Sequence, residues 1–579
     1  MLVRLFLSVT ASATKIDQST GTCMTIELAQ ACDQAPIHSL PDEILEVIFL
    51  INTSRLVEQG NENHPYDPHL TTLATAQVCQ RWRAVALDYP VIWSRIINYE
   101  QHSPLWIETL LARSGSAMID VGADSAFEPV KLQHPRGKPV LQSIFQRISC
   151  LKTVSLHIRR APWETICRSF LGHPAPNLEY LNLITSCPFP DCLYPNPLFA
   201  GEAPRLRRLH LERCLIDFSS SVLSNLTELS VASVAPILVI SSSTHSHQLV
   251  TPSVAGWLRI LKNIPTLRFL TLNSAISHLT EHEPLPVVDL PHLALLTIST
   301  RFYTGISLID HLNIPPLCGI RFRLFRNHNR STGELDGPKL LSFLSKQLTH
   351  WPQDYSNRYL QAKILSGDRI HFGNTKRIGQ ALDMTESDEV EAHSRYSKDP
   401  MLSLVLTFSP LEDPFAFLNQ LLELYSSTFP TTTTFDFWVD QEFADTVVTG
   451  GSFTALPTFH SFSNLKTLNL LEQSPLYLLP LFQHSSLPDY PLFPVLQSLY
   501  LIGTNMDDEQ GVLCSVFVAF LLKRAEARIP LPEIKILAGH ISNRTAEDLS
   551  RLGNLRVSLD STPLHHINTL MEPYVEEET

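Results

Sequence analysis

Residues 176–183 read Pro-Asn-Leu-Glu-Tyr-Leu-Asn-Leu, and this stretch decides the fold because its pattern recurs along the chain. The shared template is a leucine, two variable residues, an apolar residue, one variable residue and another apolar residue. Before residue 330 the template occurs as Leu151-x-x-Val154-x-Leu156, Leu178-x-x-Leu181-x-Leu183, Leu206-x-x-Leu209-x-Leu211, Leu226-x-x-Leu229-x-Val231, Leu267-x-x-Leu270-x-Leu272, Leu293-x-x-Leu296-x-Ile298 and Leu317-x-x-Ile320-x-Phe322. It returns as Leu465-x-x-Leu468-x-Leu470, Leu496-x-x-Leu499-x-Leu501 and, more weakly, Ile534-x-x-Leu537.

Each copy has the pattern of a short strand that follows a turn. The last two apolar residues are two positions apart, so they lie on the same face of a strand, and the first leucine fills the turn before it. Proline cannot extend a helix, and it therefore marks the start of a strand where it precedes a copy. Such positions are Ala175-Pro176-Asn177, Ala203-Pro204, Ile264-Pro265, Leu290-Pro291 and Phe493-Pro494.

This template resembles that of leucine-rich repeats, whose units each contribute one parallel strand and a returning helix or irregular segment. The resemblance implies an α/β fold in which an irregular solenoid forms a curved, stacked array. Cys214 stands where such repeats often place a Cys or Asn that satisfies backbone groups, so we expect it to be structural. Apart from the gap between Leu317 and Leu465, successive copies lie about 20 to 41 residues apart, which leaves open a generic α/β domain with leucine-rich strands.

A second pattern, typical of helices, lies nearer the amino terminus. Ser39 can cap a helix whose first turn holds Pro41, Asp42 and Glu43, because these residues suit unpaired N–H groups and the positive end of the helix dipole. Apolar residues then recur at helical spacing in two segments, formed by Ile44, Leu45, Ile48 and Phe49 and by Val78, Cys79, Trp82, Val85 and Ala86. Periodicity alone also fits two packed helices at the start of a larger domain.

The sequence motifs in and after these segments resemble those of an F-box. They are Leu40-Pro41, Val78-Cys79-x-x-Trp82 and Pro90-x-x-Trp93. The resemblance, to F-box proteins with leucine-rich repeats of the fungal type, implies docking on a Skp-family adaptor. The adaptor-binding residues carried over from the family motif are Leu40, Pro41, Ile44, Leu45, Ile48, Val78, Cys79, Trp82 and Trp93. Some of these residues must instead hold the unit together, and Trp93 is the first candidate for that role. The polar run from Arg55 to His69 is longer than in a compact F-box, and we expect a surface loop there.

The sequence predicts an all-helical F-box followed by the repeat array. Residues 1–34 are a flexible segment, 35–99 the F-box, and 100–121 a linker helix and first strand, with a left-handed helix cap at Gly115. The array spans 122–565, with a polar insertion at about 367–400 and an acidic tail at 566–579. After the insertion we expect a strand at 401–406, a helix at 415–424 and a strand at 434–439. Residues 1–13 partly imitate a secretory signal, and a start at Met24 is an alternative.

Composition narrows the classes of partner. The chain has 579 residues, of which 44% are hydrophobic and 17% charged, as in a globular protein with a large core. Its formal net charge of -13 argues against nucleic-acid binding and favours a basic partner. No apolar run approaches the roughly 18 residues that cross a bilayer.

The sequence assembles no catalytic or metal site. The ten cysteines lack the spacing of a disulfide framework or a zinc ribbon, and Cys187 and Cys192 lack a second pair. The pairs His245-x-His247 and His565-His566 lack a third ligand. Nucleophile-elbow, zinc-protease, phosphate-loop and dinucleotide motifs are absent. We therefore expect no enzymatic activity, no cofactor and no metal, with buried thiols in a reducing compartment.

These patterns predict a substrate-recognition subunit of a Skp-cullin-F-box ubiquitin ligase in the cytoplasm or nucleus. The F-box would bind the adaptor and, through it, a cullin, while the repeats would hold an unknown protein target. The main alternative is a protein-binding scaffold without a ligase role. A hidden enzyme, whose residues come together from distant positions, and a secreted repeat protein are the remaining alternatives.

Overall fold

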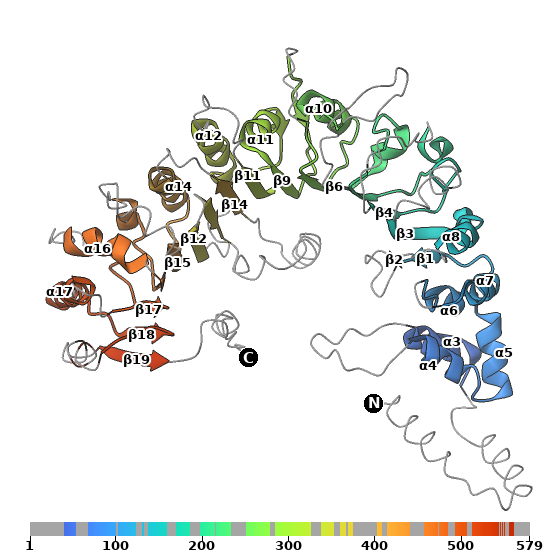
Figure 1. Cartoon of the computed structure of the whole chain (residues 1–579), viewed down its shortest axis with the longest axis horizontal. Helices are drawn as coiled ribbons and strands as arrows, with labels where there is room; N and C mark the ends of the chain where they lie inside the picture. The colour runs from blue at the N-terminus through green and yellow to red at the C-terminus, as the bar shows by residue number, and fades with distance from the viewer. Residues whose placement is uncertain are drawn as a thin grey trace, which may run out of the picture. The chain divides into compact units, whose positions relative to one another are not determined.

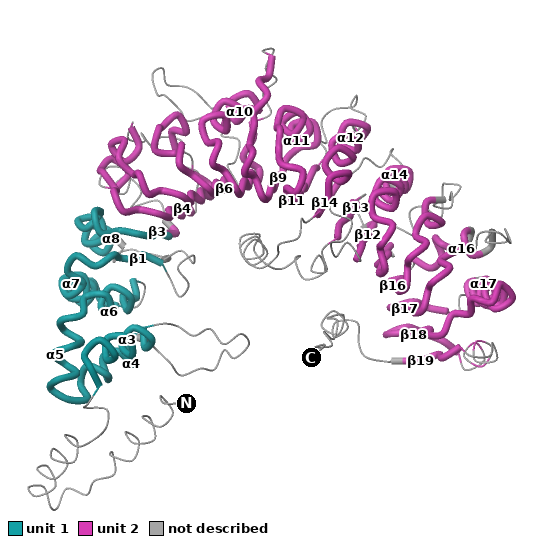
Figure 2. The backbone as a smooth tube through the Cα atoms, turned by 180° about the vertical axis from the view of Figure 1, so that it is seen from behind, with its two compact units in different colours: residues 1–155 teal, residues 156–579 magenta. Residues whose placement is uncertain are grey.

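The computed structural model describes part of the chain in detail, in two compact units at 1–155 and 156–579 (Figure 2). The described residues are 40–53, 68–99, 102–122, 130–131, 137–158, 170–185, 197–214, 216–232, 251–277, 284–325, 337–351, 359–365, 369–374, 402–407, 414–439, 457–472, 474–484, 492–506, 512–542, 545, 547, 549 and 555–560. The expectations for 1–34, for most of the 55–69 run, for Cys187, Cys192 and the two histidine pairs, and for the acidic tail lie outside these residues.

Unit 1 is mainly helical. Its helices are α3 (Asp42–Asn52), α4 (Pro68–Thr75), α5 (Gln80–Asp88), α6 (Pro90–Arg95), α7 (Pro104–Arg113) and α8 (Gly137–Phe145), with the short strands β1 (Ile119–Val121) and β2 (Val130–Lys131). The predicted helix cap after α7 is confirmed, because Gly115 has a φ of 54°. β1 runs parallel to the start of β3 (Leu151–Ile158), where Ile119 pairs with Leu151.

Unit 2 is a long, mostly parallel sheet with helices along one side (Figure 1). Its hydrogen-bonded order is β4-β5-β6-β7-β9-β11-β14-β13-β12-β15-β16-β17-β18-β19. The strands are β4 (Tyr180–Thr185), β5 (Arg208–Glu212), β6 (Glu228–Ala232), β7 (Phe269–Asn273), β9 (Leu295–Arg301), β11 (Gly319–Phe325), β12 (Tyr359–Leu365), β13 (Arg369–Gly373), β14 (Leu402–Thr407), β15 (Thr434–Val439), β16 (Thr467–Glu472), β17 (Ser498–Ile502), β18 (Glu533–Leu537) and β19 (Arg556–Asp560).

The segments that return from one strand to the next are α-helices or short 3₁₀ turns. They are η4 (Leu198–Gly201), η5 (Ser221–Asn225), α10 (Val254–Lys262), α11 (Phe302–Ile309), α12 (Gly337–Leu348), α14 (Pro414–Thr428), η6 (Pro457–Ser461), α16 (Ser474–His484) and α17 (Val512–Glu526). β8 (Val288–Asp289) and β10 (Leu312–Asn313) form a separate parallel pair beside them. The helix predicted at 415–424 and the strands predicted at 401–406 and 434–439 are confirmed as α14, β14 and β15.

The repeat template produces this ladder through one turn and two buried rows. The backbone N–H of Leu178 donates to the carbonyl of Ala175 at 3.2 Å, so Pro176 occupies the second position of a turn, which its fixed φ suits. The same bond joins Leu206 to Ala203 at 3.1 Å. The template residues then align across neighbouring strands, with every member buried, as Leu181, Leu209, Leu229, Leu270, Leu296 and Ile320.

Three features depart from the expected repeat pattern. The weak copy falls on Leu531-x-x-Ile534-x-Ile536 and not on Ile534-x-x-Leu537, because Ile534 pairs with Leu499 and Ile536 with Leu501. Residues 369–373, inside the expected polar insertion, form β13, which runs antiparallel to both β12 and β14 because the chain turns back between them. β14 therefore pairs with β11, and β12 pairs with β15. The expected core residue Leu317 is 53% exposed, and the neighbouring Cys318 is buried in its place. The rest of the expected insertion, from 375, lies outside the described residues.

Replacement of Trp93 by alanine is expected to open unit 1 selectively. Trp93 is fully buried, and its Nε1 donates to the carbonyl of Ala86 at 2.7 Å. Removing the indole leaves a cavity and an unpaired carbonyl, at a cost of about 3–5 kcal/mol. Hydrogen exchange should accelerate across residues 42–113 and stay unchanged in unit 2. The exposed Leu105→Ala on α7 is the control, and equal effects of both variants would contradict this prediction.

Replacement of Arg524 by methionine is expected to loosen the end of the ladder. Arg524 of α17 is buried, and its Nη1 donates to the carbonyls of Leu492 at 2.7 Å and Phe493 at 2.8 Å. These bonds satisfy carbonyls of the turn before β17, and their loss should cost about 3 kcal/mol. Exchange should rise in 492–506, whereas the exposed Glu526→Ala should leave it unchanged. An unchanged exchange rate in R524M would show that this contact contributes no stability.

Candidate functional site

The outward side of α3 is an exposed apolar stripe. Ile44, Val47 and Ile51 are 45%, 52% and 53% exposed, at the i, i+3 and i+7 spacing that places side chains on one side of a helix. Leu45 and Phe49 face the opposite way and are buried in unit 1. The helix therefore has apolar residues on both sides, and one of those sides is uncovered within the described residues.

The structure separates the predicted adaptor-binding residues into three groups. Pro41, Ile44 and Val78 are exposed, and Leu40, Ile48 and Cys79 are partly exposed. Leu45, Trp82 and Trp93 are buried within unit 1, so their side chains are not available to a partner. The places of Leu45 and Trp82 in the docking set are corrected, because both side chains belong to the core of this small helical unit, and the burial of Trp93 agrees with the role inside the unit that was expected for it.

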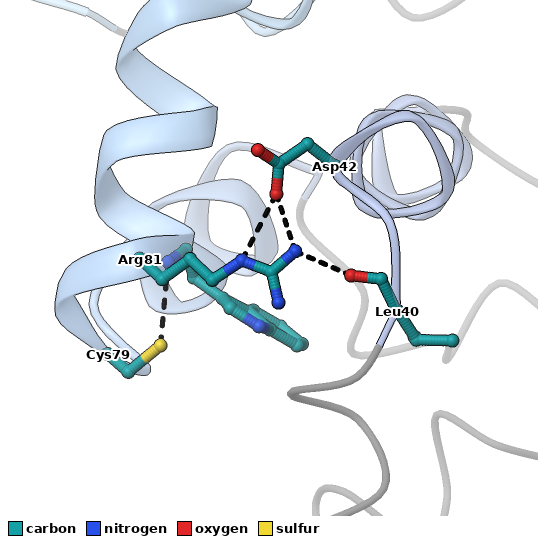
Figure 3. Close-up of polar contacts among 5 residues, drawn as sticks. Leu40, Asp42, Cys79 and Arg81 are labelled. Atoms are coloured by element: carbon teal, nitrogen blue, oxygen red, sulfur yellow. Dashed lines mark hydrogen bonds and ion pairs between the residues drawn. The ribbon is translucent and has the colours of Figure 1, made fainter. Parts of the chain in front are cut away.

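An arginine holds the two motif segments together. Arg81 of α5 donates from Nη2 and Nε to Oδ1 of Asp42, at 2.6 and 3.1 Å, and its Nη2 also donates to the carbonyl of Leu40 (Figure 3). Both side chains are partly exposed, at 37% and 59%, so the pair adds about 1 kcal/mol or less. Its effect is positional, because it fixes the Leu40-Pro41 segment beside the start of α5.

The start of α5 is fixed by its own cap. Cys79 is the N-cap residue, and its Sγ accepts a hydrogen bond from the backbone N–H of Trp82 at 3.4 Å (Figure 3). The Trp82 ring packs edge-on against Phe49 of α3, with ring centroids 5.5 Å apart. α3, by contrast, begins after Pro41 without a side-chain cap, and Ser39, which was expected to cap it, lies outside the described residues.

Sequence reasoning did not select three residues that define this site. Val47 and Ile51 extend the exposed stripe, and their helical spacing from Ile44 is a signal that was present in the sequence. Arg81 lies between two motif residues, Cys79 and Trp82, and its charge is opposite to that of Asp42. A search for opposite charges within the motif would have identified this pair.

Two buried thiols lie in unit 2, at Cys214 and Cys318. Cys214 is confirmed as a structural residue, since it is buried and its Sγ donates to the carbonyl of Leu183 at 3.4 Å. Burial raises the pKa of the Cys214 thiol well above its usual range and that of Cys318 to about 12, so both thiols remain protonated at neutral pH.

Over the described ranges, no group of three His, Cys, Asp or Glu side chains is placed to hold a metal ion. No helix of the described part has the length and apolarity to cross a membrane.

Comparisons with known proteins assign no family to the chain. No protein-family model matches it, and no curated protein matches it. Among solved structures it is similar to a leucine-rich-repeat protein of Leptospira interrogans, at 12% sequence identity and a TM-score of 0.30, over 82% of this chain and 97% of that chain. The leucine-rich-repeat architecture of unit 2 rests on its own parallel ladder, in which the template residues pair in register and face the core.

Proposed function

We propose that the chain is the substrate-recognition subunit of a Skp-cullin-F-box ubiquitin ligase. In this proposal unit 1 is an F-box that binds a Skp-family adaptor and, through it, a cullin, and unit 2 holds a protein target. The chain would carry out no covalent chemistry and would need no cofactor. Its contribution would be proximity, because a bound target meets the ubiquitin-charged enzyme at a raised effective concentration.

The observation that carries the proposal is the exposed apolar stripe of α3 beside the motif segments. Ile44, Val47 and Ile51 have the i, i+3, i+7 arrangement with which an amphipathic helix enters an apolar groove of a partner. Complete burial by a partner would remove about half of the surface of each side chain from contact with water. This would contribute about 1 kcal/mol of binding free energy for each residue. Pro41 and Val78, also exposed, belong to the motif segments that Arg81 joins.

The repeats supply the second requirement of the proposal, a surface for a target. Stacked repeats expose one face of a continuous sheet, and such faces bind proteins through the side chains that alternate with the core residues. In unit 2 these positions include Arg208, Glu228 and Phe269, which align across β5, β6 and β7 and are partly exposed. The side chains differ from strand to strand, as expected for a surface that recognises a particular partner.

The double substitution Ile44→Asp and Val47→Asp is expected to abolish adaptor binding. In an apolar interface the two carboxylates on the stripe would lose their hydration without gaining a partner. This should reduce the binding free energy by roughly several kcal/mol. Co-elution of the full chain with a purified Skp-family adaptor measures the effect. The matched control is Leu105→Asp, which places a carboxylate at an exposed leucine of α7 in the same unit, and should bind as the unchanged chain does.

Three outcomes distinguish the alternatives. Loss of co-elution in the stripe variant alone, with hydrogen exchange in residues 42–113 preserved, supports adaptor docking through α3. Adaptor binding without cullin recruitment and without ubiquitin conjugation of captured proteins would favour a scaffold. Failure of the unchanged chain to bind any Skp-family adaptor would contradict the proposal.

A further inference from the structure

The ladder of unit 2 ends at β19, and the outer side of this strand is an open edge (Figure 1). β19 runs parallel to β18, and Arg556 stands in register with Glu533. Among the described strands of unit 2, none pairs with the other side of β19. An open edge of this kind presents a row of backbone N–H and C=O groups to which a further strand can be added.

One hydrogen bond shows which residues present their backbone groups at this edge. The backbone N–H of Arg556 donates to the carbonyl of Pro532 at 2.9 Å, so the backbone groups of Arg556 face β18. Successive residues of a strand direct these groups to opposite sides, and those of Ser558 therefore also face β18. Val557 and Leu559 direct their N–H and C=O groups to the open edge.

The apolar rows of unit 2 also end uncovered at β19. Leu559 is 57% exposed, although Ile536, its register partner on β18, is fully buried. Val557 is partly exposed and stands in register with the buried Ile534. The end of an array of stacked repeats needs a cover, because no further repeat buries its apolar side. β19 contains no proline and no bulge that would keep another strand away.

The sequence of β19 is complementary to itself when its direction is reversed. It reads Arg-Val-Ser-Leu-Asp, which is a cation, an aliphatic residue, a small polar residue, an aliphatic residue and an anion. In an antiparallel pair of two copies centred on Ser558, Arg556 of each copy would stand opposite Asp560 of the other. Val557 of each copy would stand opposite Leu559 of the other. Both ends of such a pair would therefore join opposite charges.

The backbone and both faces of the sheet agree with this register. Val557 and Leu559 are the residues whose backbone groups point outward, so each opposed couple could exchange two hydrogen bonds, as in an antiparallel ladder. Residues that stand opposite each other direct their side chains to the same face. Val557 and Leu559 continue the buried rows of β18, so the core rows of one copy would run on into those of the other. A shift of one residue would set polar positions against apolar ones.

We propose that the open edge of β19 is the surface through which two copies of the chain associate, by antiparallel pairing of β19 with β19 about a twofold axis at Ser558. A twofold contact of this kind is closed, because each copy uses its single edge and leaves none for a third copy. The proposal goes beyond the proposed function and does not depend on adaptor docking. Where both hold, one assembly would carry two docking stripes and two target surfaces.

The mass of the full chain in solution tests the proposal. Sedimentation equilibrium over a range of protein concentrations should show a mass that rises from one chain to two and no further. Leu559→Pro should weaken the association at least about tenfold, because proline has no N–H to donate to the second copy. The N–H of Leu559 faces away from β18, so this variant keeps the ladder of its own chain. Leu559→Ala, which retains the N–H, is the matched control and should weaken the association less.

A charge-reversal cycle tests the register itself. Arg556→Asp would oppose two aspartates at both ends of the pair, and Asp560→Arg would oppose two arginines. Each single variant should weaken the association about tenfold, because like charges directly opposite each other destabilise a ladder and the twofold axis doubles the effect. The variant with both substitutions restores opposite charges in reversed order, and it should associate as the unchanged chain does.

Four results would overturn the assignment. They are a mass of one chain at every concentration, growth beyond two copies, equal effects of the proline and alanine variants, and no recovery in the doubly reversed variant. Unchanged hydrogen exchange in residues 533–537 verifies that each variant keeps its ladder. Adaptor co-elution is measured on the proline variant and should equal that of the unchanged chain, so failure of self-association and failure of adaptor docking are distinguishable.

Discussion

The leucine rows of unit 2 can be buried only when neighbouring strands stand in register, and the rest of the structure depends on this constraint. Leu181 and Leu209 pair directly, as do Leu209 and Leu229, so a shift of one residue would turn a whole row away from the helices. The turn before each strand limits such shifts, because the N–H of Leu178 is bonded to Ala175 and the N–H of Leu206 to Ala203. The register thus follows from a local hydrogen bond that recurs from repeat to repeat. As a consequence, the side chains on the face of the sheet opposite the helices also have a fixed spacing.

The antiparallel passage at β13 shows how this constraint permits variation. β12 and β14 keep the direction of the other strands, so the ladder continues through them even though their order in the sheet is reversed relative to the sequence. Ile370 and Phe372 still face the core, which preserves the buried rows. The change affects the face of the sheet opposite the helices. There β13 adds the side chains of Arg369 and His371, which a purely parallel stack would lack.

The sequence predicted the structural features that depend on residues close together in the chain. It did not predict the features that depend on contacts between residues far apart in the chain. The strand of Leu181 and Leu183, the cap at Gly115 and the structural role of Cys214 each follow from a local pattern. β13 could not be found this way, because its assignment requires knowing that β11 pairs with a strand that begins at residue 402. Similarly, the exposure of Leu317 depends on how β10 and β11 are joined, and the template gives no information about that connection.

The two sides of α3 illustrate the limit of periodicity most directly. Leu45 and Phe49 are buried, and at about 100° for each residue their positions force Ile44, Val47 and Ile51 to point away from the core. Polar residues at these outward positions would leave every core contact intact. Aliphatic residues there contribute nothing to the described core, and contiguous exposed apolar surface of this kind is a mark of interaction sites. The helix pattern alone could not say which apolar side faces inward. The packing of Leu45 and Phe49 decides this, and it leaves Ile44, Val47 and Ile51 as the exposed surface on which the proposed adaptor docking rests.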